Sequence, residues 1–478
     1  MSNARSGQGK EPEAGPVTSI GGSLRQAGKS ISKLAAGEAV NKITRFVAAV
    51  ILARTLSLSD FGIVNVGIAI AGILLTLTAL GMPEYGARQV AVAPGDAKRV
   101  AGVVLSVRVG ALAGIALVMI GAAAIFLSDQ LVLITLSVAM AVGLSTSGDW
   151  LLRGREQMAD AAGATALGGI VVMVGCGSLV FLLPTATAAL IVFVLGEASA
   201  AAATWWRAKL GRVEMPSWER IKQVVVANWP LGASGIIIYA SYANLDSILL
   251  AILRSDAEAG LYSAPYRLFL AANAVTLFAA YSLLPMLSRS HHEGRMHEKR
   301  SLLLRAFTPL AGYGLIVLGA AELIGGPVLE GLFGADFADT GPLLILLCMS
   351  LPIYSIGYPA GYSLIGEQRN WQFFVGGAIA GGLNIALMSV LIPLYGTYGA
   401  AIATTVGLFG GALAWLALSR SLWASAPLVA GVVLATLLGI PASMETTLAI
   451  PIGAATLLCG ATMFLAPVVK TRSRNRPS

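Results

Sequence analysis

The chain has 478 residues, of which 56% are hydrophobic and only 12% are charged, and its mean hydropathy is +0.78. A water-soluble domain carries about 25% charged residues, so the composition excludes a soluble protein and indicates an integral membrane protein. We assign the formal net charge of +8 to basic cytoplasmic loops rather than to nucleic-acid binding, because Lys and Arg gather on the cytoplasmic side of membrane proteins.

The chain begins with a polar segment and continues as a series of apolar ones. Residues 1–30 are rich in Gly, Ser and Pro, which predicts a disordered cytoplasmic tail. A membrane-spanning helix needs about 20 apolar residues, and fourteen stretches meet that requirement. In chain order they are 31–53, 61–81, 100–127, 131–152, 159–183, 185–206, 223–253, 261–287, 303–325, 341–365, 371–392, 396–419, 425–443 and 446–468. The connections are too short to hold an extramembrane domain.

The basic residues are distributed unequally between the two sides of the predicted membrane. With the N-terminus placed inside, 26 of the 32 Lys and Arg fall in cytoplasmic loops and tails or, like Lys33 and Arg305, within three residues of them. The outer loops hold only Arg54 and Arg254, and the remaining four lie within predicted spans. This bias predicts a multi-pass protein with both termini in the cytoplasm.

Similar segments recur about 200–212 residues apart. Three pairs match in the same order along the chain: 51–67 with 250–266, 151–157 with 363–369, and 180–184 with 390–394. In the first pair, Gly62 and Gly260 stand at the start of the returning helix. The matches predict two lobes of six spans, 31–207 and 223–419, which enter the membrane in the same direction. The basic loop 208–222 joins them, and an extra helix pair (425–468) and a basic tail (469–478) follow.

The first span carries polar residues on one face. Glu38, Asn41, Lys42 and Arg45 follow one another at i, i+3, i+4 and i+7, which places them on the same side of a helix. At 1.5 Å per residue, Arg45 lies about 18 Å beyond Lys33, too deep to reach the cytoplasmic surface easily. Since ionisable groups are costly in a membrane, we expect this face to line a water-filled cavity. A Glu38–Lys42 pair within the helix is the structural alternative.

Other spans contribute further polar candidates. These are Arg108, Glu197, Tyr239, Tyr242, Asp246 and Arg267. The two tyrosines and Asp246 share one face of the seventh span with Gly235. Asp246 and Arg267 lie on adjacent spans, so we expect them either to pair or to face each other across the cavity mouth. Glu197 is a lone acid in the sixth span, for which both a scaffold role and a functional role stay open.

The sequence holds no convincing catalytic or metal-binding motif. The segment GGSLRQAGKS (21–30) has one residue too many between its glycines for a phosphate-binding loop. The three histidines fall within 291–300 at the wrong spacing for an HExxH zinc site, and the three cysteines lie far apart. We therefore expect no catalytic residue, no metal site and no cofactor, apart from a coupling cation of unknown identity.

Four stretches of the sequence resemble one family of transporters. They are ILARTLSLSDFGIVNVGIAIAGILLTLTALGM (51–82), NLDSILLAILRSDAEAGLYSAPYRLFLA (244–271), FGADFADTGPLLILL (333–347) and LNIALMSVLIPLYGTYGAAIATTVG (383–407). Together they resemble the Wzx-type flippases of O-antigen and exopolysaccharide synthesis. These flippases form the polysaccharide-transport branch of the superfamily that also contains the multidrug (MATE) exporters and the lipid II flippase. Ser57 stands where this family usually has Gly.

The resemblance implies an all-α membrane protein in which two six-helix lobes surround a central cavity and two helices are added. It also implies a substrate, an oligosaccharide on polyprenyl pyrophosphate, which is flipped from the cytoplasmic to the periplasmic leaflet of the bacterial inner membrane. The product would enter lipopolysaccharide or another surface polysaccharide. Relatives hold the pyrophosphate with cationic residues, and the candidates for that role here are Lys42, Arg45, Arg108 and Arg267. Asn41, Tyr239 and Tyr242 complete the substrate-binding set, and Glu38, Asp246 and Glu197 are candidates for ion coupling.

The expected partners are the lipid-linked oligosaccharide, membrane lipids, a polysaccharide polymerase and a chain-length regulator, with no nucleic acid. Two alternative functions stay open. A MATE-like drug/cation antiporter would favour acids over cations in its cavity, and this chain has both. A membrane polysaccharide polymerase or glycosyltransferase would need a catalytic loop domain, for which the loops are too short.

The charge distribution predicts a labelling pattern. Cysteines introduced at Ser57, Ser255 and Ala338 should react with a membrane-impermeant thiol reagent in intact cells, because these positions lie in predicted outer loops. Cysteines introduced at Ser217 and Gly294 should react only after the membrane is opened. The reverse pattern would contradict the predicted orientation.

Overall fold

The computed structural model describes residues 20–228, 245–421, 425–434, 436 and 451–464. Every regular element in these residues is a helix. The first half contains α1 (Ile20–Thr55), α2 (Leu58–Ala79), α3 (Met82–Val92), α4 (Ala97–Phe126), α5 (Leu131–Thr146), α6 (Asp149–Gly154), α7 (Met158–Gly175), a π-helical turn (Cys176–Val180) and α8 (Ala186–Ala208). The second contains α10 (Leu245–Leu253), α11 (Asp256–His292), α12 (Met296–Phe333), α13 (Gly341–Cys348), α14 (Leu351–Gly366) and α15 (Asn370–Leu418).

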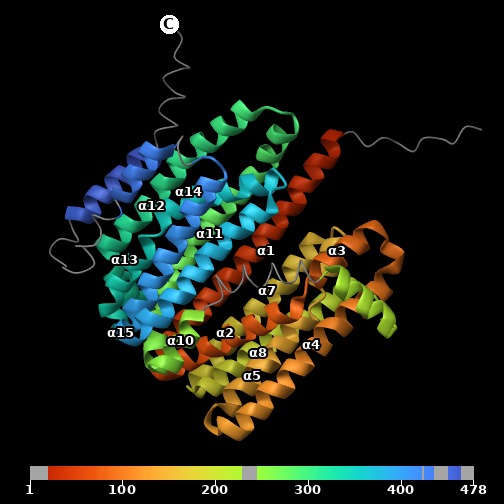
Figure 1. Ribbon diagram of the computed structural model, residues 1–478. Coiled ribbons are helices and arrows are strands. Elements are labelled where there is room, and N and C mark those ends of the chain that lie inside the picture. The colour runs from red at the N-terminus through yellow and green to blue at the C-terminus, as the bar shows by residue number, and fades with distance from the viewer. Residues whose placement is uncertain (1–19, 229–244, 422–424, 435, 437–450, 465–478) are drawn as a thin grey trace, which may run out of the picture.

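The helices form two bundles. Figure 1 shows α2–α8 gathered in one bundle and α11–α15 in the other, with α1 running between them. The described residues include nine helices that are long and apolar enough to cross a membrane, as expected of a multi-pass membrane protein. The first helix is not one of the nine because its charged residues interrupt the apolar run. The predicted all-α fold with two lobes is confirmed.

The longest element, α15, contains two of the predicted spans. A straight helix of 49 residues would be about 74 Å long, far more than a bilayer needs. The backbone breaks at Gly396, whose φ of 55° and ψ of −128° lie outside the helical range. The chain then turns back, so that the Trp415 indole near its end donates to the Phe373 carbonyl near its start at 2.9 Å. The predicted separation into 371–392 and 396–419 is therefore correct.

Some element boundaries differ from those expected. Helix α1 begins at Ile20, so residues 20–30 of the predicted tail are helical. Residues 20–55 contain no proline that would break this helix. The predicted span 131–152 is broken between α5 and α6, where the Thr204 hydroxyl accepts a hydrogen bond from the Gly148 amide at 2.8 Å.

Local structure supports the internal repeat at its first pair of segments. Ser57 begins α2 and accepts a hydrogen bond from the Asp60 amide at 3.1 Å. Ser255 begins α11 and accepts one from the Glu258 amide at 3.2 Å. A serine in this position satisfies an amide that has no partner within the helix. The same cap thus begins the second helix of one half and its counterpart in the other.

In the second pair of segments, an arginine that caps the C-terminus of another helix is repeated. Arg155 donates to the carbonyl oxygen of the last residue of α8 at 2.6 Å, and Arg369 donates to that of the last residue of α15 at 3.0 Å. A cation favours a helix C-terminus because the last carbonyls lack partners and carry partial negative charge. Beside these arginines, Glu156 and Gln368 both take left-handed φ values, 60° and 59°. Such values are uncommon for residues other than glycine, so their repetition supports a common origin of the two halves.

The C-terminal helix pair lies against the second bundle. Residues 451–464 pack on α12 through glycines that recur seven residues apart on both helices. A Cβ at Gly312 would lie 2.7 Å from the Gly460 carbonyl oxygen, and a Cβ at Gly319 would lie 2.8 Å from that of Gly453. Small residues allow such close approach of membrane helices. The predicted extra pair is therefore joined to the second lobe.

A buried ion cluster holds one end of the second bundle together. The Lys299 ammonium at the start of α12 pairs with Glu367, which follows α14, and each side chain is only 10% exposed. Arg369 donates to the other Glu367 carboxylate oxygen at 3.1 Å. Burial alone would raise the pKa of Glu367, but hydrogen bonds and positive charge from Lys299 and Arg369 outweigh it, so its pKa is lowered.

This cluster predicts a pH-dependent loss of stability. A carboxyl with a lowered pKa stabilises the folded state above its ordinary pKa of about 4.3, and that contribution is lost as the pH falls through the lowered value. Glu367→Gln should therefore cost about 3 kcal/mol at pH 7, because it leaves Lys299 buried without its counter-ion. The deficit should shrink at acid pH, as thermal unfolding of the detergent-solubilised protein would show. Glu298→Gln, which removes an exposed pair with Arg295, is the matched control and should change stability by less than about 1 kcal/mol.

Candidate functional site

The two bundles meet where α2 crosses α11. A Cβ at Gly62 would lie 1.8 Å from the carbonyl oxygen of Asp256, and a Cβ at Gly260 would lie 2.3 Å from that of Leu58. Each carbonyl belongs to the residue four positions before the other glycine, so the two halves of the repeat contact each other symmetrically. Only glycine allows the two backbones to come this close.

Aromatic rings and one arginine extend this contact. The rings of Phe61 and Phe337 lie 6.0 Å apart, and those of Phe46 and Phe333 lie 6.1 Å apart, edge to face in both cases. The Arg54 guanidinium, at the end of α1, donates to the Leu332 carbonyl near the end of α12 at 2.8 Å. We call the Gly62–Gly260 crossing, the two ring pairs and Arg54 the outer seal. The orientation predicted from the basic residues would place this end of the molecule on the outer side.

Arg45 lies on α1 and is held by two neighbours from its own lobe. Its Nη2 donates to the Glu197 carboxylate on α8 at 2.6 Å, and its Nε donates to the Asn41 amide oxygen at 3.0 Å. The Glu197 side chain is 7% exposed, whereas that of Arg45 is 28% exposed. The Arg45 guanidinium therefore keeps an accessible edge while its other edge is fixed. The structure brings together three predicted site residues here.

Two further cations connect the lobes. Lys42 on α1 is exposed, and its ammonium lies 5.0 Å from the centre of the Phe278 ring on α11, a cation–π contact. Arg267 on α11 donates to the Asn65 amide oxygen on α2 at 2.5 Å. The sequence analysis missed Asn65 and Phe278, although a polar residue in the apolar second span was a usable signal for Asn65.

The charged groups at this interface lie at a common depth. Arg45, Glu197 and Arg267 are each ten or eleven residues from the outer end of their helices. At 1.5 Å per residue this is about 15–17 Å, the middle of a hydrocarbon layer about 30 Å thick. Transporters of repeated architecture bind their substrates at this depth, between the two halves.

Arg108 lies elsewhere. It is 3% exposed within the first bundle, and its Nη2 donates to the Leu144 carbonyl on α5 at 3.2 Å. Leu144 is in the last turn of α5, so Arg108 neutralises a helix C-terminus. This contact gives the residue a structural role and separates it from Lys42, Arg45 and Arg267.

Asp246 lies in a separate buried cluster. Its carboxylate accepts hydrogen bonds from the Ser247 amide at 3.0 Å and from the Tyr262 hydroxyl. Thr404 lies 3.4 Å from the Tyr262 hydroxyl and accepts a hydrogen bond from Asn384 at 3.4 Å. Four oxygen-bearing side chains from α10, α11 and α15 thus converge within the second lobe.

The expected contact between Asp246 and Arg267 was wrong. Within the part of the chain that the structure describes, Asp246 faces Tyr262 and Arg267 faces Asn65. Tyr262 and Arg267 are five residues apart on α11, so they point in different directions around the helix. Helix α11 therefore directs Tyr262 towards α10 and Arg267 towards α2.

Some candidates cannot be placed. Tyr239, Tyr242 and their neighbour Gly235 lie outside the described residues, and so does the side chain of Glu38. The predicted Glu38–Lys42 pair therefore stays a prediction.

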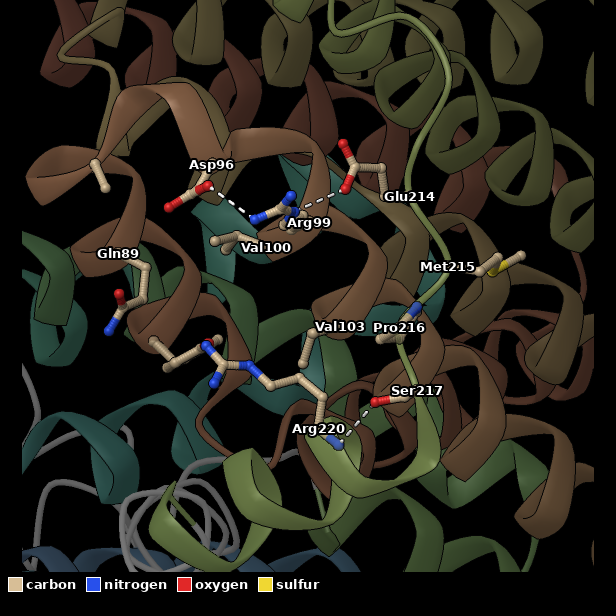
Figure 2. A pocket seen from close by; sticks show the side chains of 12 residues that line it. Gln89, Asp96, Arg99, Val100, Val103, Glu214, Met215, Pro216, Ser217 and Arg220 are labelled. Carbon is tan, nitrogen blue, oxygen red and sulfur yellow. Dashed lines mark hydrogen bonds and ion pairs between the residues drawn. The ribbon is translucent and has the colours of Figure 1, made fainter.

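A cavity of about 510 Å³ lies away from the lobe interface, among α3, α4 and the segment that follows α8. Figure 2 shows Arg99 in it between Asp96 and Glu214, at distances of 3.7 and 2.9 Å. Two acids neutralise Arg99, and although Arg220 also lines the cavity, all of the lining residues come from the first half of the chain, so the cavity is not shared between the two lobes. We therefore place the candidate functional site at the lobe interface.

Comparison with known sequences bears on the identity of the chain. The model of the family described as polysaccharide biosynthesis protein matches residues 27–291, more than half of the chain. This chain belongs to that family. A curated relative of this polysaccharide biosynthesis protein, the probable flippase AglR of Haloferax volcanii, is 26% identical over 196 residues. The match spans 40% of this chain and 40% of the length of the relative.

Solved structures show which fold this polysaccharide biosynthesis protein has. The lipid II flippase MurJ, in an inward closed conformation, matches with a TM-score of 0.70 over 91% of this chain and 99% of its own, at 13% identity. An inward-facing multidrug resistance MATE family transporter matches with a TM-score of 0.67 over 82% of this chain and 97% of its own, at 14% identity. The predicted fold, which the lipid II flippase and the MATE transporter share, is confirmed.

The outer seal predicts that one added side chain at Gly62 will separate α2 from α11. Gly62→Val should force α2 away from α11, because no space exists beside the Asp256 carbonyl. We expect Ala259→Cys, whose position is fully buried in the seal, to resist an impermeant maleimide in a background without native cysteines and to react when Gly62→Val is added. Gly110→Val is the control, since nothing lies within 4 Å of a Cβ there. Equal labelling in all three backgrounds would show that the contact does not close the molecule.

Proposed function

We propose that this member of the polysaccharide biosynthesis family flips polyprenyl-pyrophosphate-linked oligosaccharides from the cytoplasmic to the periplasmic leaflet of the inner membrane. The single observation that carries the proposal is the group of cations at mid-membrane depth between the two lobes. Lys42 and Arg45 come from one lobe and Arg267 from the other. Cations are costly at this depth, which favours a functional reason for them.

The chemistry of these cations suits a diphosphate. A guanidinium binds phosphate oxygens through two parallel hydrogen bonds, and an ammonium adds a point charge. Arg45 is partly accessible and its Nε is held by Asn41 on the same helix, so little side-chain entropy is lost when it binds. We infer that Arg45 and Lys42 form the primary contact with the headgroup.

Arg267 takes part at a different stage. Its hydrogen bond to Asn65 joins α11 to α2 across the lobe interface, close to the outer seal. If the lobes separate at that end, the hydrogen bond from Arg267 to Asn65 breaks, and the Arg267 guanidinium then requires another acceptor. A diphosphate held by Arg45 would satisfy that need, and binding of the substrate would then favour rearrangement of the lobes.

The lipid part of the substrate would remain among apolar side chains. On α1, Ile43 and Val47 are 62% and 37% exposed beside the polar face, and on α11, Val275 and Phe278 are each 51% exposed. A polyprenyl chain beside these residues would stay in a hydrocarbon environment while the headgroup crosses. We infer that a polymerase and a chain-length regulator receive the product on the outer side.

The cluster around Asp246 is our candidate for binding a coupling cation. It offers carboxylate, hydroxyl and amide oxygens, the ligand types that hard cations prefer. The same cluster and the shared fold favour the second candidate function, drug/cation antiport of the MATE type. That function would not need cations at mid-membrane depth, and for this reason we place the lipid-linked oligosaccharide first.

Reconstituted flipping of a lipid-linked oligosaccharide tests the proposal. Arg45→Ala should abolish flipping and Arg45→Lys should restore part of it, because the lost phosphate contact is worth about 1.5–3 kcal/mol, roughly a ten- to hundredfold loss of affinity. Arg99→Ala, in the cytoplasmic cavity, is the matched control and should flip normally. Normal flipping by an Arg45→Gln, Glu197→Gln double variant would show that Arg45 serves only the scaffold. Cation-driven drug efflux without flipping would favour the antiporter instead.

A further inference from the structure

The ion pair between Glu197 and Arg45 is not explained by the proposed function alone. A site built to bind a diphosphate gains nothing from a carboxylate, yet Glu197 is bonded at 2.6 Å to the arginine that we assign to the headgroup. The carboxylate accepts from Arg45 through the same type of charge-assisted hydrogen bond that a phosphate oxygen would form. Glu197 and the substrate therefore compete for one cation.

The ionisable groups near Glu197 leave it a single counter-ion. On the helices packed against α8, and on the described part of α1 near it, they are Asp60, Asp149, Arg153, Asp160, Cys176, Lys42 and Arg45. Asp60 bonds to the Ala186 amide at the outer end of α8, and Asp160 pairs with Arg207 at the other end. Asp149 and Arg153 pair with each other on α6. Among the described side chains, only Arg45 contacts the Glu197 carboxylate.

Close packing keeps Glu197 in place. A Cβ at Gly143 on α5 would lie 2.8 Å from the Glu197 Cβ, and a Cβ at Gly168 on α7 would lie 2.9 Å from the Gly196 carbonyl oxygen. The helix that carries Glu197 therefore cannot shift away from these neighbours, and the Glu197 side chain is only 7% exposed, so it stays buried if Arg45 turns to another anion. A buried carboxylate without a counter-ion is strongly unfavourable, and binding a proton removes its charge.

We propose that Glu197 occupies the anion site of the empty transporter, and that the substrate diphosphate displaces it from Arg45 with the uptake of one proton. This inference rests on the proposed function. It gives Arg45 one anionic partner in the empty state and another in the loaded state. The arginine is then never left unpaired at mid-membrane depth, and the empty transporter can return without its substrate.

A competing explanation makes Glu197 a positioning residue that only orients Arg45. The two explanations predict opposite changes in the affinity for a diphosphate. If Glu197 competes, removing its charge strengthens binding of a diphosphate, whereas if it only positions Arg45, removing its charge weakens binding. Asn41 provides a comparison, because it accepts a hydrogen bond from Nε of the same guanidinium without any charge of its own.

The test is calorimetric titration of the full-length protein in detergent with farnesyl pyrophosphate, a short prenyl diphosphate. Titrations in two buffers of different ionisation enthalpy count the protons taken up on binding. We expect Glu197→Gln to bind the probe roughly tenfold more tightly, as when a competing charge-assisted hydrogen bond is removed, and to take up about one proton fewer than the wild type. Glu197→Asp keeps a carboxylate and should keep the proton uptake, and Asn41→Ala should only weaken binding.

Each outcome decides between the explanations. Weaker binding by Glu197→Gln, with an unchanged proton count, would overturn the inference and make Glu197 a positioning residue. Asp160→Asn removes an acid of the same lobe that is paired far from Arg45, and it should behave as the wild type. Failure of the proposed function would look different, because the wild type would then show no saturable binding that depends on Arg45.

Discussion

The cost of a charge in the middle of a bilayer is the constraint on which this structure depends. An ionisable side chain there must be paired, hydrogen-bonded or in contact with water. Each intramembrane arginine satisfies this condition in its own way. Arg45 pairs with Glu197, Arg267 donates to Asn65, and Arg108 donates to the carbonyl at the end of α5. These three solutions distribute the arginines between a candidate binding site, a contact across the lobes and the interior of one lobe.

Close approach of helices is the second constraint on the structure, and glycine residues allow it. Hydrophobic burial gives little driving force between helices in lipid, so association depends on packing and hydrogen bonds. The outer seal and the attachment of residues 451–464 to α12 both use glycines that lie against a facing backbone. At Gly62 and Gly260 the contact joins equivalent positions of the two halves. A single glycine in an ancestral half would have supplied both sides of the seal.

The candidate site and the outer seal are mechanically related. Arg267 is seven residues after Gly260 on α11, and Asn65 is three residues after Gly62 on α2. A rotation that separates the glycines also separates the hydrogen-bonded pair, because each helix moves as a rigid element. In the proposed mechanism, occupation of the cationic site and closure of the seal would thus be coupled through two helices, which alternating access requires.

The sequence by itself determined the membrane class, the order of the spans that the structure describes, the internal repeat and the polar side of α1 around Arg45. All of these depend on hydropathy, spacing and loop charge, which are local properties of the chain. Only the tertiary structure decided the partners: Glu197 for Arg45, Asn65 rather than Asp246 for Arg267, and a helix terminus for Arg108. Residues 45 and 197 lie 152 positions apart, and no local pattern specifies which of several buried acids a given arginine meets. That choice follows from the rotation of each helix about its axis, which is set by packing of small side chains against neighbours distant in the sequence.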